Sequence, residues 1–300
     1  MNWNFDTSII VQGIAQSEAA EHLPQMIACG TKIVAGVSIN YPDPELEKIP
    51  VFPLVEDAIK EVGNIETSVV FMPPYQVLDA GLEAIASGIK QLVIVTRNVP
   101  PLDTIKLLQA AKAHNVALLG AGSAGIMIPE KLCLGSLKPE YFSLGNVGII
   151  GYGKALIYEV AWVLKEAEIG QSMAVALGKD KIIGSQLIQW LEILNEDEST
   201  DAIVLIQSVK DIDHDALKLI AERIQKPIIC YVAGIQTPAE EFFREGLDIV
   251  KNYLYNSVVN TNSDKKNIAL IKKSGLITTS KISEIPQLAI KSFSNSAKSK

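Results

Sequence analysis

Short β-branched runs alternate with segments of helical period along the first half of the chain. This pattern predicts strands at Ser8–Gly13, Thr31–Val37, Thr67–Phe71, Gln91–Val95 and Val116–Leu119. It predicts helices between them at Ser17–Cys29, Leu54–Val62, Gln76–Ser87 and Pro100–His114. Such β-α-β units have right-handed crossovers and give a parallel sheet with helices on both faces. The pattern therefore predicts a doubly wound α/β domain over residues 1–128.

The alternation is lost over residues 129–145, where prolines and glycines predict a linker. A second alternation follows, with strands at Val147–Ile150, Ser172–Leu177, Ala202–Ile206 and Pro227–Val232. Helices are predicted at Lys154–Glu168, Gly184–Leu194, His214–Ile224 and Ser263–Ser274. The pattern is typical of a flavodoxin-like domain over residues 146–300, and it places Trp162 and Trp190 on the inner faces of its helices. The segment Lys291–Lys300 is interpreted as a flexible, solvated tail.

Composition narrows the function classes. The 300 residues are 48% hydrophobic with a formal net charge of −7, which fits a globular protein with two cores and argues against nucleic acid as a partner. Apolar runs are too short to span a membrane, and the amino terminus lacks a signal sequence, so we expect a cytoplasmic protein. The 3 cysteines and 3 histidines are scattered, which predicts reduced thiols and no metal site.

Two loops are rich in small residues. They are Gly13–Ser17, after the first predicted strand, and Gly120–Gly125, after the fifth. Ligands of open α/β sheets bind outside the carboxyl ends of the strands, so we expect any ligand of the first domain to meet these loops.

Several collinear segments resemble the α subunit of succinyl-CoA ligase over nearly the whole chain. They are Gln12-Gly13, Gly30–Val37, Met72-Pro73, Gly88–Lys90, Gly148–Ile150, Tyr158-Glu159, Gly170–Ser172, Gly184-Ser185, Asp201–Val204 and Tyr231–Gly234. The resemblance implies a Rossmann-like CoA-binding domain followed by a flavodoxin-like succinyl-CoA synthetase domain, both with parallel sheets. It also implies a transiently phosphorylated histidine in the second domain and an ATP-grasp β subunit as partner.

The resemblance implies that CoA is the cofactor. The cofactor-binding positions that it implies are Gly13, Ser17, Lys32, Pro73 and Ser123. The glycine-rich phosphate turn of the family is absent, because the sequence here is Ile14–Ala19 and includes Glu18, which would repel an anion. We therefore expect CoA binding to be weak or absent. Two interpretations of Ser17 stay open, a phosphate donor or only a helix cap.

The phosphohistidine position is occupied by Glu245. A phosphohistidine relay needs an imidazole nitrogen that accepts and releases a phosphoryl group near neutral pH, and no other histidine lies in that segment. The serine-rich turn of the family reads Gly151-Tyr152-Gly153-Lys154, and Ser208 stands where the family has a glutamate that orients the histidine. Hydroxyl donors are lost, but backbone donors and a new cation predict that Gly151, Gly153 and Lys154 bind an anion.

Three functions remain open at this point. The first is a catalytically deficient homologue that acts as a binding or regulatory subunit with an ATP-grasp partner. The second is an active acyl-CoA ligase with an altered phosphoryl relay, and the third is a CoA or nucleotide sensor. Glu245 is either a fixed carboxylate that faces Lys154 or a partly solvated side chain on a remodelled surface.

Overall fold

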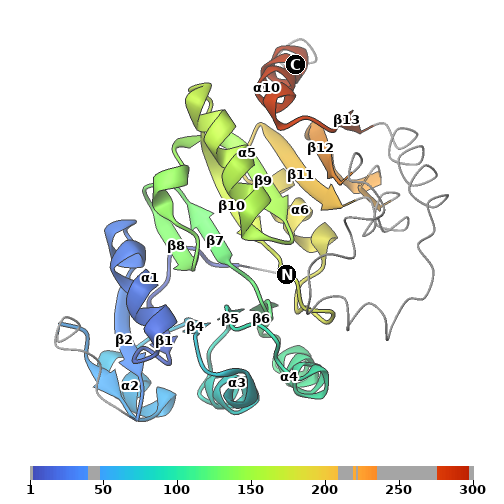
Figure 1. Ribbon diagram of the computed structural model, residues 1–300. Helices are drawn as coiled ribbons and strands as arrows, with labels where there is room; N and C mark the ends of the chain where they lie inside the picture. The colour runs from blue at the N-terminus through green and yellow to red at the C-terminus, as the bar shows by residue number, and fades with distance from the viewer. Residues whose placement is uncertain (1–2, 40–47, 209–218, 221, 235–275, 297–300) are drawn as a thin grey trace.

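The computed structural model describes residues 3–39, 48–208, 219–220, 222–234 and 276–296. The first sheet is parallel throughout, with the strand order β3-β2-β1-β4-β5-β6 (Figure 1). Its strands are β1 Ile9–Gln12, β2 Ile33–Val37, β3 Val51–Phe52, β4 Thr67–Val70, β5 Gln91–Ile94 and β6 Ala117–Leu119. The alternation pattern predicts all of these strands except β3, which at two residues is too short to show a period.

Helices cover both faces of this sheet. They are α1 Ser17–Ala28, α2 Val55–Val62, α3 Val77–Ala86 and α4 Pro101–Ala113, with a short 3₁₀ helix η2 at Pro74–Gln76. Helices α2, α3 and α4 share one apolar layer, whereas α1 lies on the other face, toward the second domain (Figure 1). β1, β4 and β5 are buried at every residue, which explains why they read as continuous apolar runs.

The strand order reverses between β1 and β4, which is the switch point of a doubly wound sheet. The Rossmann-like fold expected for the first domain is therefore confirmed, and its crevice lies where β1 and β4 end.

The second sheet has the strand order β13-β12-β11-β9-β10-β7-β8. Its strands are β7 Gly125–Ile128, β8 Leu132–Gly135, β9 Leu144–Gly151, β10 Gln171–Ala176, β11 Ala202–Ser208, β12 Ile228–Ala233 and β13 Ile277–Thr279. Strands β13 to β10 run parallel, and their order confirms the flavodoxin-like topology. Helices α5 Lys154–Glu166 and α10 Ile285–Ser296 cover one face, and α6 Leu187–Glu196 covers the other (Figure 1).

The segment predicted to be a linker contains structure that the sequence pattern does not reveal. Strands β7 and β8 form an antiparallel hairpin, and β7 adds to the edge of β10. The hairpin precedes the short 3₁₀ helix η3 at Pro139–Tyr141. Because both strands are short and almost wholly buried, they show no polar-apolar alternation, and the second sheet is not purely parallel.

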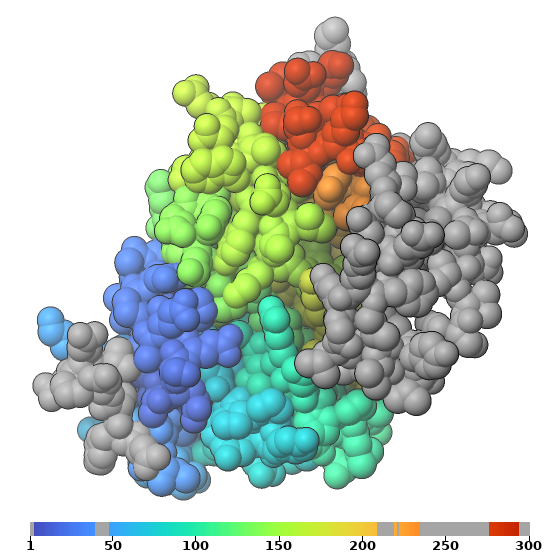
Figure 2. Space-filling view, viewed as in Figure 1, coloured from blue at the N-terminus to red at the C-terminus, as the bar shows by residue number. Residues whose placement is uncertain are grey.

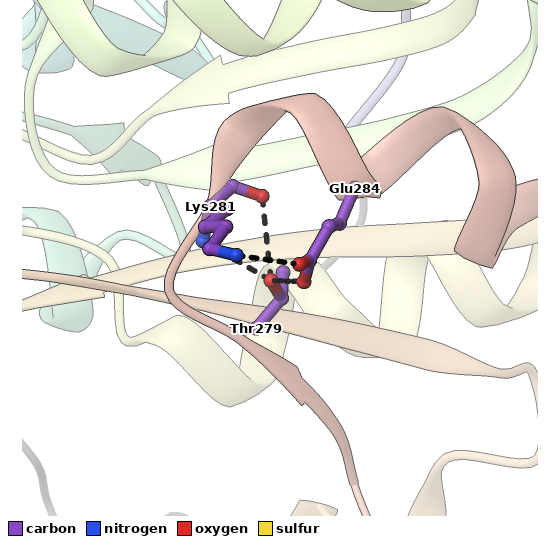
Figure 3. Close-up of polar contacts among 3 residues, drawn as sticks. All are labelled: Thr279, Lys281 and Glu284. Carbon is purple, nitrogen blue, oxygen red and sulfur yellow. Dashed lines mark hydrogen bonds and ion pairs between the residues drawn. The ribbon is translucent and has the colours of Figure 1, made fainter.

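The carboxyl-terminal helix α10 was also missed by the pattern. It packs on α5 and the sheet through Ile285 and Ala289, so the chain is helical to Ser296 where a solvated tail was expected. A polar cluster precedes the helix (Figure 3): the Thr279 hydroxyl donates to the Glu284 carboxylate at 2.6 Å, and Lys281 Nζ lies 3.5 Å from the same carboxylate. The predicted helix Ser263–Ser274 and most of His214–Ile224 lie outside the described residues.

One apolar core joins the two domains. It runs from the α1 face of the first sheet through the hairpin to the second sheet. Polar contacts fix the junction, because Thr31 Oγ1 accepts from the Cys133 N–H at 2.9 Å and donates to the Cys133 carbonyl oxygen at 2.9 Å. In Figure 2 the surface of α1 adjoins that of the second domain. This contact lies at the amino edge of the first sheet, because Thr31 precedes β2, and it fixes the hairpin against that sheet.

Candidate functional site

Loops from both domains meet in a narrow pocket, here called the cradle. Its charged lining residues are Glu18, Arg97, Lys154 and Lys179. Glu18 and Arg97 belong to the first domain, whereas Lys154 and Lys179 follow strands β9 and β10 of the second. Backbone from Gly122 and Gly153 completes the walls. The cradle therefore lies at the carboxyl ends of both sheets, where α/β folds bind ligands.

The turn between β9 and α5 forms one wall of the cradle. Gly151 ends β9, Gly153 is the N-cap of α5, and Lys154 is the first residue of that helix. A side chain at position 153 would clash with Lys179, whose Cε lies 2.2 Å from the place of a Cβ atom. Gly153 thus allows Lys179 to lie directly over the amino terminus of α5. Gly153 and Lys154 line the cradle, whereas Gly151 is buried and is not among its lining residues, so anion binding by the three stays a prediction.

Positive charge dominates this pocket. Among the described side chains that line it, Arg97, Lys154 and Lys179 are cationic and Glu18 is the acid. The amino terminus of a helix carries partial positive charge, so cations placed there are unfavourable unless an anion compensates them. The cradle therefore has the electrostatic character of an anion site.

Neither Lys179 nor Arg97 is identified as a site residue by the sequence analysis. A signal for both was present, since each follows a predicted parallel strand by a few residues. Residues at this edge face the ligand side of an α/β sheet. What the sequence cannot reveal is that the carboxyl edges of two separate sheets converge.

The crevice of the first domain brings together Gly13, Ser17 and Pro73. Gly13 has a φ of +78°, and a Cβ there would lie 2.9 Å from Met72 Sδ and 3.1 Å from the Met72 backbone nitrogen. Pro73 follows at the amino end of η2. Ser17 is the exposed first residue of α1, and Gln16 is the N-cap, so the interpretation of Ser17 as the helix cap is wrong.

This crevice fits the phosphates of CoA only in part. Gln16 makes no side-chain capping bond, so backbone donors of the first turn of α1 are not used by it. Ile14, however, is fully buried and packs against Gly36, and Glu18 places a carboxylate in the first turn. A bare glycine turn that lets a diphosphate approach closely is thus replaced by a bulky anchor and an acid.

Two predicted cofactor residues do not join this crevice. Lys32 is exposed and precedes β2, and its carbonyl oxygen accepts from the Ile9 N–H at the start of β1. It therefore lies at the amino edge of the sheet, opposite to Gly13. Ser123 is 1% exposed, and its hydroxyl donates to the Ala176 carbonyl oxygen and accepts from the Gly125 N–H at 2.8 Å. The donor role of Ser123 thus joins the two domains, and its acceptor role holds the local turn before β7.

Replacing Ser123 with alanine should show whether this residue acts in stability or in CoA binding. The variant leaves the buried Ala176 carbonyl and Gly125 N–H without their partner, so the free energy of unfolding should fall by about 1–3 kcal/mol. Calorimetry with CoA should give the same signal for both proteins. Loss of a CoA signal in a variant of unchanged stability would restore Ser123 to the cofactor site.

A larger cavity adjoins the cradle at the carboxyl ends of β9, β10 and β11. It is lined by Tyr152, Leu156, Ile183, Ile206, Gln207 and Ser208, among other residues. Ser208, at the position of the orienting glutamate, is the last residue of β11 and lies in this wall. Glu245, at the phosphohistidine position, lies outside the described residues, so its predicted contact with Lys154 stays a prediction.

The part of the chain that the structure describes has neither a metal cluster nor a membrane-spanning helix. No group of three or more His, Cys, Asp or Glu side chains in that part is arranged to hold a metal ion. Over the same residues, no helix combines the length and apolarity needed to cross a membrane. All three cysteines are buried as free thiols, and burial raises the pKa of Cys230 to about 12.

Comparison with known proteins gives consistent results for the two halves of the chain. Residues 4–98 match the CoA binding domain family. Solved structures that resemble this fold over most of the chain include an ATP citrate lyase from Methanothrix soehngenii in complex with citrate and coenzyme A, with a TM-score of 0.75 and 15% identity. An acetyl-coenzyme A synthetase from Ca. Korarchaeum cryptofilum has a TM-score of 0.70 and 21% identity. This chain covers 51% and 59% of those chains, respectively, so the likeness establishes the fold alone.

Sequence relatives are closer. The α subunit 2 of succinate–CoA ligase from Archaeoglobus fulgidus is 34% identical over 77% of this chain and 80% of its own length. The corresponding α subunit from Aquifex aeolicus is 34% identical over 78% of each chain. Identity at this level across both domains exceeds what a shared fold alone would give. The chain belongs to the family of ADP-forming succinate–CoA ligase α subunits.

Proposed function

We propose that this chain is a catalytically deficient member of its family that acts as a binding or regulatory subunit with an ATP-grasp β subunit. The observation that carries the proposal is the composition of the cradle. Where the family has a serine-rich turn, this chain has glycines at 151 and 153 and cations at 154 and 179. The turn therefore lacks the hydroxyl donors that the family has there, while its cations and backbone N–H groups can still bind an anion.

The groups needed for phosphoryl transfer are missing from the sequence positions that the family uses. Glu245 replaces the phosphohistidine, and Ser208 replaces the glutamate that would orient it. Of the three histidines, His22 is buried and His114 is exposed at the end of α4, both in the first domain, and His214 lies outside the described residues. A relay histidine must reach the nucleotide on a partner subunit, and neither position follows the family's site.

CoA binding is also expected to be weak, because the phosphate turn of the first domain has changed. The first domain keeps the CoA-binding fold and the Gly13 turn. Ile14 and Glu18, however, stand where close approach and positive potential are needed. A regulatory subunit needs the scaffold for docking its partner and does not need a tight cofactor site.

The test is reconstitution with a candidate β subunit. We expect a stable complex by size-exclusion chromatography and no succinate-dependent formation of succinyl-CoA above the background of the β subunit alone. The α and β subunits from Aquifex aeolicus provide the positive control for the assay. Robust turnover would contradict the proposal that the chain is catalytically deficient. Failure to form a complex with any β subunit of the family would contradict the proposal that it pairs with one.

The alternative is an active ligase with an altered phosphoryl relay. Backbone donors at the amino terminus of α5 and three nearby cations favour it, because they can hold a phosphoryl group. In that mechanism a Glu245 carboxylate oxygen would attack the γ-phosphorus of ATP, release ADP and carry an acyl phosphate. Turnover that disappears in Glu245→Gln but persists in Glu222→Gln would establish this alternative.

A further inference from the structure

His22 lies at the domain junction in an unusual environment. Its side chain is only 4% exposed, and its ring stacks beside Phe71 at a centroid distance of 6.5 Å. The ring nitrogen Nδ1 is buried and has no hydrogen-bond partner among the described residues. An imidazole held in this way favours its neutral form, because protonation would add a buried charge whose new N–H has no acceptor.

The position of His22 on α1 places it next to the cradle. Glu18, His22 and Gln25 are spaced by four and three residues, so they lie along one face of the helix. Glu18 lines the cradle, and Gln25 lines a second cavity between α1 and the segment from 127 to 143. His22 therefore lies between these two cavities on the face that meets the second domain.

Charges from both domains act on His22. Burial lowers its pKa most, and Glu21, Lys154, Glu18 and Lys138 follow in decreasing order of effect. The two glutamates lie on α1 and raise the pKa, whereas the two lysines of the second domain lower it. Lys138 itself lies 3.8 Å from Glu21, and Lys154 is a wall of the cradle. The cradle and His22 are thus coupled through Lys154.

We propose that binding of a dianion in the cradle and protonation of His22 are linked, so that the chain holds its anion more tightly in mildly acidic solution. This inference rests on the anion site of the proposed function. A bound anion offsets the charge of Lys154 and attracts the imidazolium directly, so it removes part of the repulsion that opposes protonation. By thermodynamic reciprocity, the proton must strengthen anion binding by the same factor.

Histidine NMR with sulfate tests the linkage, because sulfate stays doubly charged over the whole titration whereas phosphate does not. Saturating sulfate should raise the pKa of His22 by about 0.5 unit, equivalent to roughly threefold tighter binding below this pKa than above it. His114, which is exposed at the end of α4, provides an internal reference in the same spectra. Sulfate should leave its signals unchanged at any one pH.

Two lysine variants sharpen the test. Lys154→Gln should raise the pKa of His22 in sulfate-free buffer and remove most of the change in this pKa that sulfate causes. Lys112→Gln, at an exposed position on α4, should change neither the pKa of His22 nor its response to sulfate. If sulfate binds in the cradle and the pKa of His22 does not change, the linkage is overturned, but the assignment of the cradle as an anion site is kept. If sulfate binds nowhere near Lys154, the anion site of the proposed function and the linkage are both overturned.

Discussion

Replacing Arg97, Lys154 and Lys179 together with glutamine should lower the affinity of the protein for sulfate about 100-fold, because each lost charge contact costs about 1 kcal/mol at a partly exposed site. The three cations come from two domains and converge with the amino terminus of α5 on one pocket. Isothermal calorimetry at low ionic strength would measure the loss, since screening weakens such contacts at high salt.

Two matched variants make this result specific to the cradle. Replacing the exposed Lys90, Lys106 and Lys112 with glutamine removes the same net charge from the first domain, and sulfate affinity should fall less than about threefold. Glu18→Gln should act in the opposite direction and raise the affinity by about two- to fivefold, because it removes the acid from the pocket. If both triple variants lost the same sulfate affinity, the binding would depend on the net charge of the protein and not on a site in the cradle.

Trp190→Ala should lower the free energy of unfolding by about 3–5 kcal/mol, the range for removing a large aromatic side chain from a core. Trp190 is fully buried on α6, and the Trp3 ring packs against it, with the two planes tilted by 37° and the centroids 5.0 Å apart. The contact ties the amino-terminal segment to the second domain. Urea denaturation would show the loss as a lower midpoint, provided that the slope is unchanged.

Trp162 is the natural control for this variant. The sequence pattern places it on an inner helix face, but it is 46% exposed, with Tyr141 packed edge-on and Lys165 Nζ 5.8 Å from its ring centre. Trp162→Ala should therefore cost about 1 kcal/mol or less. Similar losses in the two variants would show that the core does not depend on the Trp190 contact.

The architecture of both domains could be predicted because long buried strands and amphipathic helices leave periodic patterns. Helix α5 was predicted from its first residue, Lys154, to within two residues of its end. The hairpin β7–β8 could not be predicted, since short strands buried on both faces carry no alternation. The packing of α10 onto the core was missed because its second half belongs to the serine- and lysine-rich segment Lys291–Lys300, although apolar residues such as Ile285 and Ala289 have helical spacing.

The candidate site was predictable only within each domain. Gly13 and Pro73, and separately Gly151 and Lys154, come together because each pair follows the carboxyl ends of neighbouring strands or one strand-helix turn. Lys32 stands at the start of the predicted strand Thr31–Val37, so the strand pattern alone places it at the amino edge of the sheet, away from Gly13, where the resemblance implies a cofactor residue. The role of Ser123 as a junction between domains depends on Ala176, 53 residues away, and sequence spacing cannot reveal such a contact.

Phosphate transfer is the most direct measure of the central claim. The purified chain, its β partner and ATP labelled at the γ-phosphate would be incubated with and without succinate and CoA, and the chain examined by autoradiography and intact mass spectrometry. We predict no label on this chain, while the Aquifex aeolicus α subunit with its own partner becomes labelled under the same conditions. A stoichiometric phosphate on this chain, whether on His22, Glu245 or another side chain, would contradict the account.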